Sequence, residues 1–253
     1  MGARVGLMIA LIAVLWLGGC GTTGEGNIYP PPDDFDQNGP DLEPPTGPSY
    51  DLRDYFFNAN LWDGQTVSEA LHRYYLDSAG HLQEEDIGEV IYEPLESSEG
   101  ITVSMFVDNN LSRKYLPGLF EITEYVYDTN GIFTDERDWS REVRVNETVS
   151  TFTANGKRVY CYLKRHYDDI FEDIDVMQLA GAASLDDRRS GSNGWYYTDV
   201  LEISCVTRDP LDRVEMLFAN GYGRIFATMQ IQKDDGSWQT YDEFVNRYGI
   251  DYQ

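Results

Sequence analysis

Short stretches in which apolar and polar residues alternate dominate the chain between residues 101 and 233. In Ile101–Val107, for example, every second residue is apolar. A period of two is typical of strands that bury one face. Turn sequences such as Asp128–Gly131 and Asn220–Gly221 separate the stretches. The predicted strands are 101–107, 120–127, 132–139, 141–146, 148–153, 157–166, 195–207, 213–219 and 222–233.

Two stretches that flank these strands predict helices. Thr66–Glu69 has the spacing of a capping box, and apolar residues recur at helical spacing before Gly80. Thr240–Glu243 repeats the spacing, with Gly249 where a C-terminal cap belongs. A further helix or irregular excursion is expected at Asp168–Ala183. We therefore expect a mainly β (α+β) fold, a strongly curved antiparallel sheet or incomplete barrel with a short helix at each end.

The first twenty residues predict an export signal. A basic head with Arg4 precedes the apolar run Val5–Leu17, which is too short for a membrane-spanning helix of ~20 residues but suits the core of a signal peptide. The following Leu17-Gly18-Gly19-Cys20 resembles the lipobox of bacterial lipoproteins. That resemblance implies cleavage before Cys20 and acylation of its thiol. An ordinary signal peptide with a chance cysteine is the alternative.

The lipobox resemblance also implies a location. Two or three acyl chains hold a protein stably at a membrane, whereas one chain holds it only marginally. In proteobacterial lipoproteins an aspartate after the lipidated cysteine retains the protein at the inner membrane, and Gly21 stands there in this chain. The resemblance thus implies a cell-envelope protein anchored in the outer membrane, facing the periplasm or the surface. In a bacterium with one membrane, the same residues imply anchorage to that membrane.

Composition divides the rest of the chain. Residues 21–50 hold seven of the ten prolines and no Lys or Arg, and they offer almost nothing apolar to bury. Such a segment is expected to be a disordered, extended linker. We predict a signal peptide at 1–19, a lipidated cysteine with an acidic linker at 20–50, and a single β-rich domain at 51–253.

The chain is strongly acidic, with 44 Asp and Glu against 19 Lys and Arg, a formal net charge of −25. Binding to nucleic acid needs a basic footprint, so the charge excludes a nucleic-acid partner. It also argues against a surface that binds anionic lipids. Solubility in a salty medium explains the acidity, and weak cation binding is the alternative.

Cys161 and Cys205 remain once Cys20 is lipidated. Each alternates with apolar residues, so both thiols should point to the apolar face of their strands. A disulfide between them is plausible in an oxidising envelope, and two buried free thiols are the alternative. A catalytic cysteine is not expected, because an apolar face disfavours the thiolate.

No other motif indicates chemistry. The three histidines show no zinc spacing, and no G-x-S-x-G sequence occurs. Asp128–Gly131 and Asp234–Gly236 place oxygen ligands near a glycine but do not complete a calcium loop. The acidic run at 168–175 is expected to be solvated. We therefore expect no catalytic residues, no metal and no cofactor.

A second resemblance lies near the end of the chain. Asp199–Ile203, followed by Leu217–Ile225, resembles the closing segment of envelope lipoproteins of uncharacterised function, in which a strand enters a Gly-x-Gly turn and returns. Those proteins are similar to half-barrel lipoprotein carriers and receptors of the periplasm, whose concave face takes acyl chains. Tyr222 stands where the family usually has valine, and no ligand-contacting residue can be transferred.

These features predict a non-catalytic envelope lipoprotein that binds an acyl chain, a glycan or an envelope protein. A hydrolase that uses dispersed carboxylates and a structural scaffold without a small ligand are the alternatives. Exposed aromatic rows suit such ligands. The aromatic candidates to line a groove are Tyr55, Phe56, Phe57, Trp62, Tyr74, Tyr75, Tyr160, Tyr162, Trp195, Tyr196, Tyr197 and Tyr222.

Overall fold

A computed structural model describes residues 40–97, 100–154, 156–169, 197–207, 212–233 and 235–248. Strands make up most of this part, so the expected mainly β fold is confirmed. The predicted signal peptide 1–19, Cys20, and most of both the linker 20–50 and the excursion 168–183 lie outside the described residues.

The described chain contains two short helices and fourteen strands. In chain order they are β1 (Thr46–Asp51), α2 (Leu52–Phe56), the 3-10 helix η1 (Ala59–Asp63), β2 (Val67–Leu76), β3 (Leu82–Ser97), β4 (Gly100–Val107), β5 (Asn110–Pro117), β6 (Glu121–Tyr127), β7 (Phe133–Ser140), β8 (Glu142–Val145), β9 (Thr148–Ala154), β10 (Lys157–Asp169), β11 (Thr198–Thr207), β12 (Asp212–Ala219), β13 (Gly223–Gln232) and β14 (Trp238–Tyr248).

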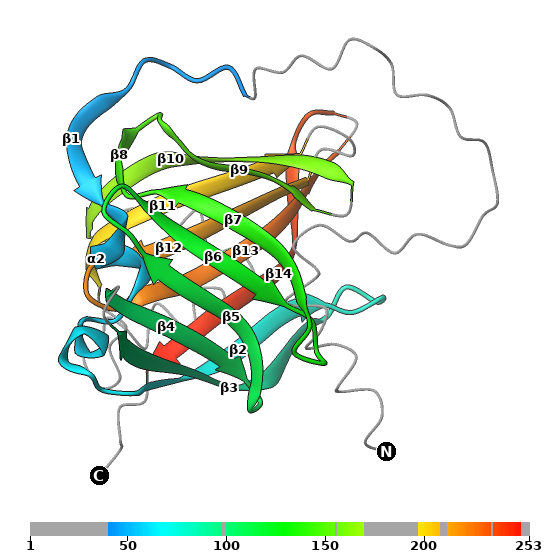
Figure 1. The fold of residues 1–253 in the computed structure, drawn as a ribbon. Helices are drawn as coiled ribbons and strands as arrows, with labels where there is room; N and C mark the ends of the chain where they lie inside the picture. The colour runs from blue at the N-terminus through cyan, green and yellow to red at the C-terminus, as the bar shows by residue number, and fades with distance from the viewer. Residues whose placement is uncertain are drawn as a thin grey trace, which may run out of the picture.

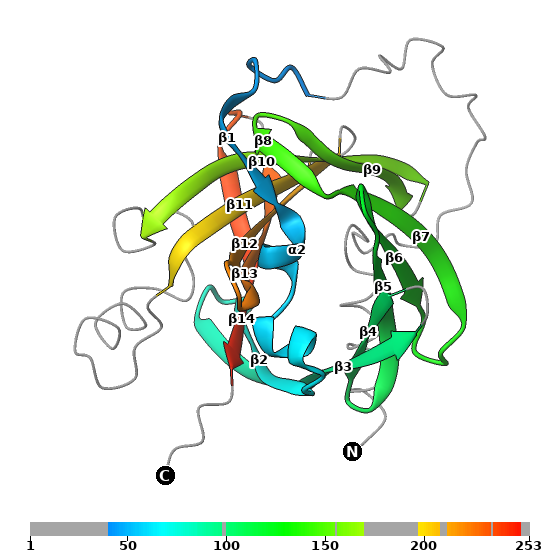
Figure 2. The same ribbon diagram turned by 60° about the vertical axis from the view of Figure 1, so that its left-hand side comes forward.

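Twelve strands form one antiparallel sheet in the order β7-β6-β5-β4-β3-β2-β14-β13-β12-β11-β10-β9. The sheet is thus two meanders, β2–β7 and β9–β14, joined where β2 pairs with β14. It curls until its two end strands, β7 and β9, lie side by side (Figures 1 and 2). Ser150 Oγ on β9 donates a hydrogen bond of 2.6 Å to the carbonyl oxygen of Asp138 on β7. The predicted curved sheet is therefore a nearly closed barrel.

Tight turns connect the neighbouring strands. Asp108 and Asn109, between β4 and β5, both have positive φ (48° and 63°), as a two-residue hairpin loop requires. Asn and Asp tolerate this left-handed conformation better than other non-glycine residues. The predicted turns at Asp128–Gly131 and Asn220–Gly221 are present, and Gly131 and Gly221 have φ of 72° and 74°.

Both predicted helices, over 66–80 and 240–249, are wrong. Residues 67–76 form β2, and residues 238–248 form β14. These two strands pair with each other, with Tyr75 opposite Asp242, so a contact between the two ends of the domain overrides the local helical pattern. Glu69 was expected to cap a helix, but it is buried at 2% exposure. Gly80 lies in the β2–β3 turn with φ of 81°.

The helices of the domain are instead α2 and η1, which precede the sheet. Figure 2 shows α2 within the ring of strands. The Asp51 side chain caps α2 by accepting a hydrogen bond from the Arg53 amide, and it also pairs with Arg141, with Nη2 2.6 Å from Oδ2. The Tyr55 hydroxyl donates to Asp199 Oδ1 at 2.7 Å. These contacts fix α2 to the wall of the barrel.

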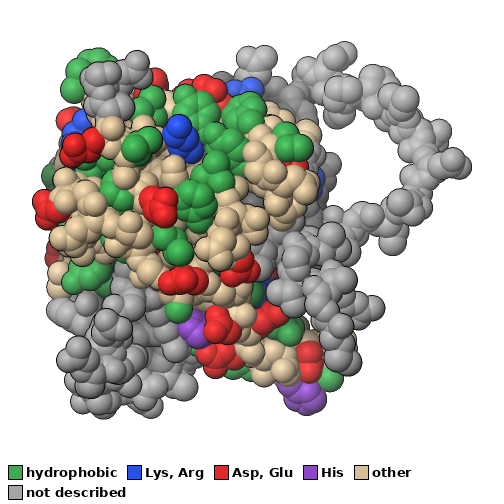
Figure 3. Space-filling view, turned by 60° about the horizontal axis from the view of Figure 1, so that its bottom comes forward, with side chains coloured by type: hydrophobic (Ala, Val, Ile, Leu, Met, Phe, Trp, Pro, Cys, Tyr) green, Lys and Arg blue, Asp and Glu red, His purple; other side chains and the backbone are tan. Residues whose placement is uncertain are grey.

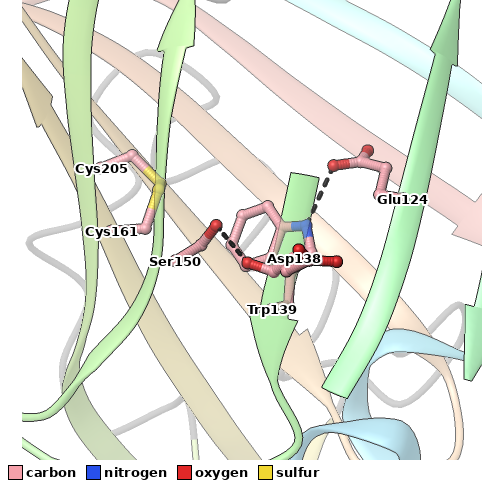
Figure 4. The surroundings of a disulfide bond; sticks show 6 residues. All are labelled: Glu124, Asp138, Trp139, Ser150, Cys161 and Cys205. Atoms are coloured by element: carbon pink, nitrogen blue, oxygen red, sulfur yellow. Dashed lines mark hydrogen bonds between the residues drawn. A yellow bond between two sulfur atoms is a disulfide. The ribbon is translucent and has the colours of Figure 1, made fainter. Parts of the chain in front are cut away.

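The disulfide expected between Cys161 and Cys205 is confirmed. The two residues are directly opposite each other on β10 and β11, with 4.0 Å between their Cα atoms. Both belong to the buried core, and Figure 4 shows the bond between their sulfur atoms. The shared apolar face that the sequence pattern indicated is what brings the two sulfur atoms together.

Candidate functional site

A pocket lies inside the barrel, next to Phe56 of α2. Its empty space amounts to about 510 Å³, part of which is open to solvent. Ten residues from α2, β3, β4, β5, β6, β7, β12 and β13 line it: Phe56, Tyr92, Met105, Arg113, Tyr115, Glu124, Trp139, Met216, Phe218 and Arg224.

One side of the pocket is apolar. Phe56 of α2 stacks on Phe218 of β12, with ring centroids 4.7 Å apart, and meets Trp139 of β7 edge-on at 5.3 Å. Met105 and Met216 add flexible thioether side chains from β4 and β12. Methionine adapts its shape to irregular apolar surfaces. This side of the pocket therefore suits an apolar group of variable shape.

The opposite side is polar and centres on the Glu124 carboxylate of β6. Arg113 Nη1 lies 2.8 Å from Oε1, and the Tyr115 hydroxyl donates to the same oxygen at 3.4 Å. Trp139 Nε1 donates to Oε2 at 3.0 Å, as Figure 4 shows. Arg113 and Glu124 are both only 5% exposed. Donors from β5 and β7 thus surround a buried carboxylate.

These neighbours set the charge state of the carboxylate. Burial by itself raises the pKa of Glu124, but the charges of Arg113 and Arg137 and the hydrogen bonds from Trp139 and Tyr115 outweigh it, so its pKa lies below the ordinary value. The same pair raises the pKa of Arg113, because the nearby carboxylate outweighs the effect of burial. Glu124 is therefore ionised at neutral pH and is unsuited to act as a proton donor.

Two tyrosines complete the polar side. Burial, followed by the negative charge of Glu69, raises the pKa of Tyr92 well above the ordinary value. Burial and the charge of Glu124 raise the pKa of Tyr115. Arg224, which also lines the pocket, opposes both shifts. Both hydroxyl groups remain protonated at neutral pH and can act as hydrogen-bond donors.

Strand register explains how these residues meet. Arg113 is opposite Met105 on β4 and Val126 on β6, and Tyr115 is opposite Glu124. Residues at every second position of neighbouring strands point to the same side of a sheet. The alternation that predicts an apolar inner face is therefore interrupted at a few inner positions by charged residues, and these positions form the polar side of the pocket.

The sequence pattern predicted few of the residues that line this pocket. Of the aromatic candidates, Phe56 alone lines it. Phe57 packs edge-on against Trp62 and Tyr115 in the core, while Tyr197 and Tyr222 contact each other. Trp195 and Tyr196 lie outside the described residues. Most of the aromatic candidates in the described part are thus core or surface residues.

The weak cation candidates are turns. Asp128 Oδ1 accepts hydrogen bonds from the amides of Asn130 and Ile132, and Asp235 Oδ1 accepts one from the Ser237 amide. The carboxylate oxygens therefore stabilise hairpin loops. Within the described ranges, no group of three or more His, Cys, Asp or Glu side chains could hold a metal ion.

His166 takes part in the contacts that hold α2. Its Nε2 lies 2.9 Å from Asp199 Oδ1, and its ring stacks on Tyr50 with centroids 4.8 Å apart. Burial raises the pKa of Asp199, but the hydrogen bonds from Tyr55, His166 and Asn220 lower it more. Asp199, on β11, therefore stays ionised at neutral pH and links α2 to β10 and to the β12–β13 turn.

No helix in the described part of the chain has the length and hydropathy needed to cross a bilayer. No protein-family model and no curated protein sequence matches the chain. A solved structure from Parabacteroides distasonis, described as a "putative lipoprotein", aligns over 78% of this chain and 99% of its own, with 9% identity and a TM-score of 0.30. A TM-score this low establishes neither a shared fold nor a shared function.

Proposed function

We propose that this protein is a lipid-anchored envelope protein that binds a small amphipathic ligand inside its barrel. The pocket carries the proposal, because it combines an apolar side of Met105, Met216 and Phe218 with a polar side around Glu124. An acyl chain fits this arrangement better than a glycan, because the hydroxyl groups of a glycan would lack partners along the apolar side.

The binding part of the proposal predicts quenching of Trp139, which lines the pocket. The test uses the mature chain expected after signal cleavage, residues 20–253, with Cys20→Ser to keep it free of lipid. Brominated stearic acid should quench tryptophan fluorescence in a saturable manner, and the quenching should be largely lost in Trp139→Phe. Quenching that is linear in probe concentration, or unchanged in Trp139→Phe, would contradict the proposal.

A pair of substitutions at Met105 sharpens this test. Met105→Gln keeps the length of the side chain but places an amide on the apolar side of the pocket, where an acyl chain cannot satisfy it. We expect about a tenfold loss of affinity for the brominated probe. Met105→Leu is the matched control and should bind nearly as tightly as the unaltered chain. If both variants bind the brominated probe with equal affinity, the probe binds outside the pocket.

The anchor part of the proposal rests on the lipobox resemblance at Cys20. Cells that are fed an alkyne-labelled fatty acid should label the unaltered protein, and Cys20→Ser should abolish both the label and cleavage of the signal. In a bacterium with two membranes, density separation should place the labelled protein in the outer membrane, because Gly21 follows the cysteine. Label retained in Cys20→Ser would contradict lipidation at this residue.

The pocket supports binding more than it supports hydrolysis by carboxylates. Glycoside hydrolysis uses two carboxyl groups, one of which must stay protonated. Glu124 is the one carboxylate among the ten lining residues, and its lowered pKa keeps it ionised. We therefore assign it to structure and ligand orientation.

A further inference from the structure

One polar group of the pocket has no partner inside the protein. The side chain of Tyr92, on β3, lines the pocket and is only 9% exposed. Its hydroxyl group forms no hydrogen bond with any residue in the part of the chain that the structure describes. Buried tyrosine hydroxyl groups usually have a hydrogen-bond partner. The hydroxyl group of Tyr92 is therefore available to a bound molecule.

The other polar side chains of the lining already interact within the protein. Arg113 pairs with the Glu124 carboxylate, which also accepts a hydrogen bond from Tyr115. Arg224 has interactions of its own. A ligand that bound to these groups would compete with their existing contacts. Tyr92 can donate a hydrogen bond to a ligand without losing such a contact.

The charges of the pocket balance one another. Three arginines and three carboxylates among the described residues lie in its lining or beside it: Arg113, Arg137, Arg224, Glu69, Glu124 and Asp135. Arg137 Nε lies 2.8 Å from Asp135 Oδ2, just as Arg113 Nη1 lies 2.8 Å from Glu124 Oε1. Burying a further charge without a partner is costly. The pocket therefore favours an uncharged ligand.

The outside of the molecule favours the same choice. The chain has a net charge of −25, and on the face in Figure 3 acidic side chains clearly outnumber Lys and Arg. The field of such a surface repels an approaching anion. An anionic ligand would thus meet repulsion outside the barrel and no net positive charge inside it.

Tyr92 lies beside the apolar side of the pocket. It is directly opposite Met105 on β4, and both residues belong to the same buried core. Burial, followed by the charge of Glu69, raises the pKa of Tyr92 well above the ordinary value, so the hydroxyl group keeps its proton and can donate it to a hydrogen bond. An apolar chain along Met105 would bring its polar end to this donor. The matching group on the ligand is an acceptor oxygen.

Resting on the proposed function, we propose that the polar end of the ligand is uncharged and accepts a hydrogen bond from the Tyr92 hydroxyl group, as the carbonyl oxygen of a fatty-acid ester does. The ligand class is then a neutral acyl ester, and an ionised fatty acid binds more weakly. The acyl chain lies along Met105. The ion pairs of the pocket keep their partners when the ligand binds.

The first test compares brominated methyl stearate with brominated stearic acid, by quenching of Trp139 in the mature chain with Cys20→Ser. At pH 8 the free acid is ionised, whereas the ester carries no charge. We expect the ester to bind about tenfold more tightly than the acid, because the acid brings a charge that the pocket does not compensate. This comparison needs no variant of the pocket.

The second test removes the hydroxyl group. Tyr92→Phe should lower the affinity for the ester about fivefold, the effect of one lost neutral hydrogen bond, and should leave the affinity for brominated octadecane unchanged, because an alkane has no acceptor. Tyr160→Phe is the matched control. Tyr160 is also buried, at 6% exposure, and its hydroxyl group also lacks a hydrogen bond within the described residues, but it does not line the pocket. This control should change neither affinity.

The outcomes separate the two proposals. Equal affinities of the unaltered chain for ester and acid would overturn the uncharged head group and leave binding in the pocket intact. Unchanged affinity of Tyr92→Phe for the ester would overturn the hydrogen bond. Equal losses for ester and octadecane would also overturn it, because they would mean that Tyr92 only shapes the pocket. Saturable quenching by none of the probes would overturn the binding function itself.

Discussion

Glu124→Leu should lower the free energy of unfolding by about 3–5 kcal/mol, because removing one partner of a buried ion pair leaves the other charge uncompensated. Here the substitution removes the carboxylate that pairs with Arg113, 2.8 Å from Nη1, and that accepts the hydrogen bond of Trp139 Nε1 at 3.0 Å. Chemical denaturation followed by circular dichroism measures the change.

Two controls identify the cause of this loss. Arg113→Met combined with Glu124→Leu removes both charges, so the double variant should be more stable than Glu124→Leu alone. Arg144→Leu breaks a pair with Glu147 in which the Arg144 side chain is 48% exposed, and it should cost less than about 1 kcal/mol. A double variant that is less stable than Glu124→Leu would mean that lost packing, not the buried charge, dominates.

Replacing both Cys161 and Cys205 by alanine should lower the free energy of unfolding by about 4 kcal/mol. The disulfide closes a loop with a sequence separation of 44 residues, and the chain-entropy model assigns a loop of this length about that much stabilisation. The disulfide is covalent and denaturants do not cleave it, so the oxidised protein keeps this bond throughout denaturation in the absence of reductant.

Reductant is the control for this prediction. The unaltered chain, unfolded in the presence of a strong reductant, should lose a similar amount of stability, and the double alanine variant should not respond to reductant. If the unaltered chain is equally stable with and without reductant, although mass spectrometry shows full reduction, then the bond contributes nothing to stability.

The sequence predicts the second half of the barrel well. From 141 onwards, the described strands agree with the alternation of apolar residues except at β14, and this alternation also places both cysteines on one face. In the first half, β3 and β5 are not predicted. β3 contains Gly88 and Pro94, which normally argue against a strand. Pro94 is tolerated because the β2–β3 ladder stops at Val67 and Tyr92, which leaves Pro94 paired with β4 alone.

The pocket residues could not be predicted from the sequence either, because they lie far apart along the chain. They come from eight different elements, of which the helix α2 and the strands β3 and β5 were not predicted. The sequence nevertheless marks two buried charges. Glu124 lies between the buried residues Ile122 and Val126 on the inner face of β6. Glu69 lies in the same way between Val67 and Leu71 on β2. A charged residue that interrupts an apolar face must find a partner inside the protein. Sequence alone does not name that partner, because Arg113 reaches Glu124 only through the register of β5 and β6.

The pairing of β2 with β14 determines when the barrel can be completed during synthesis of the chain. Each meander consists of local hairpins, which can form as the chain emerges from the ribosome. The pairing of the two meanders has to wait for Trp238–Tyr248, the last strand described. Met105 belongs to the first meander and Met216 to the second, so the cavity does not exist before that moment. Until then, both meanders carry an unpaired edge strand, whose free backbone groups can pair with another chain.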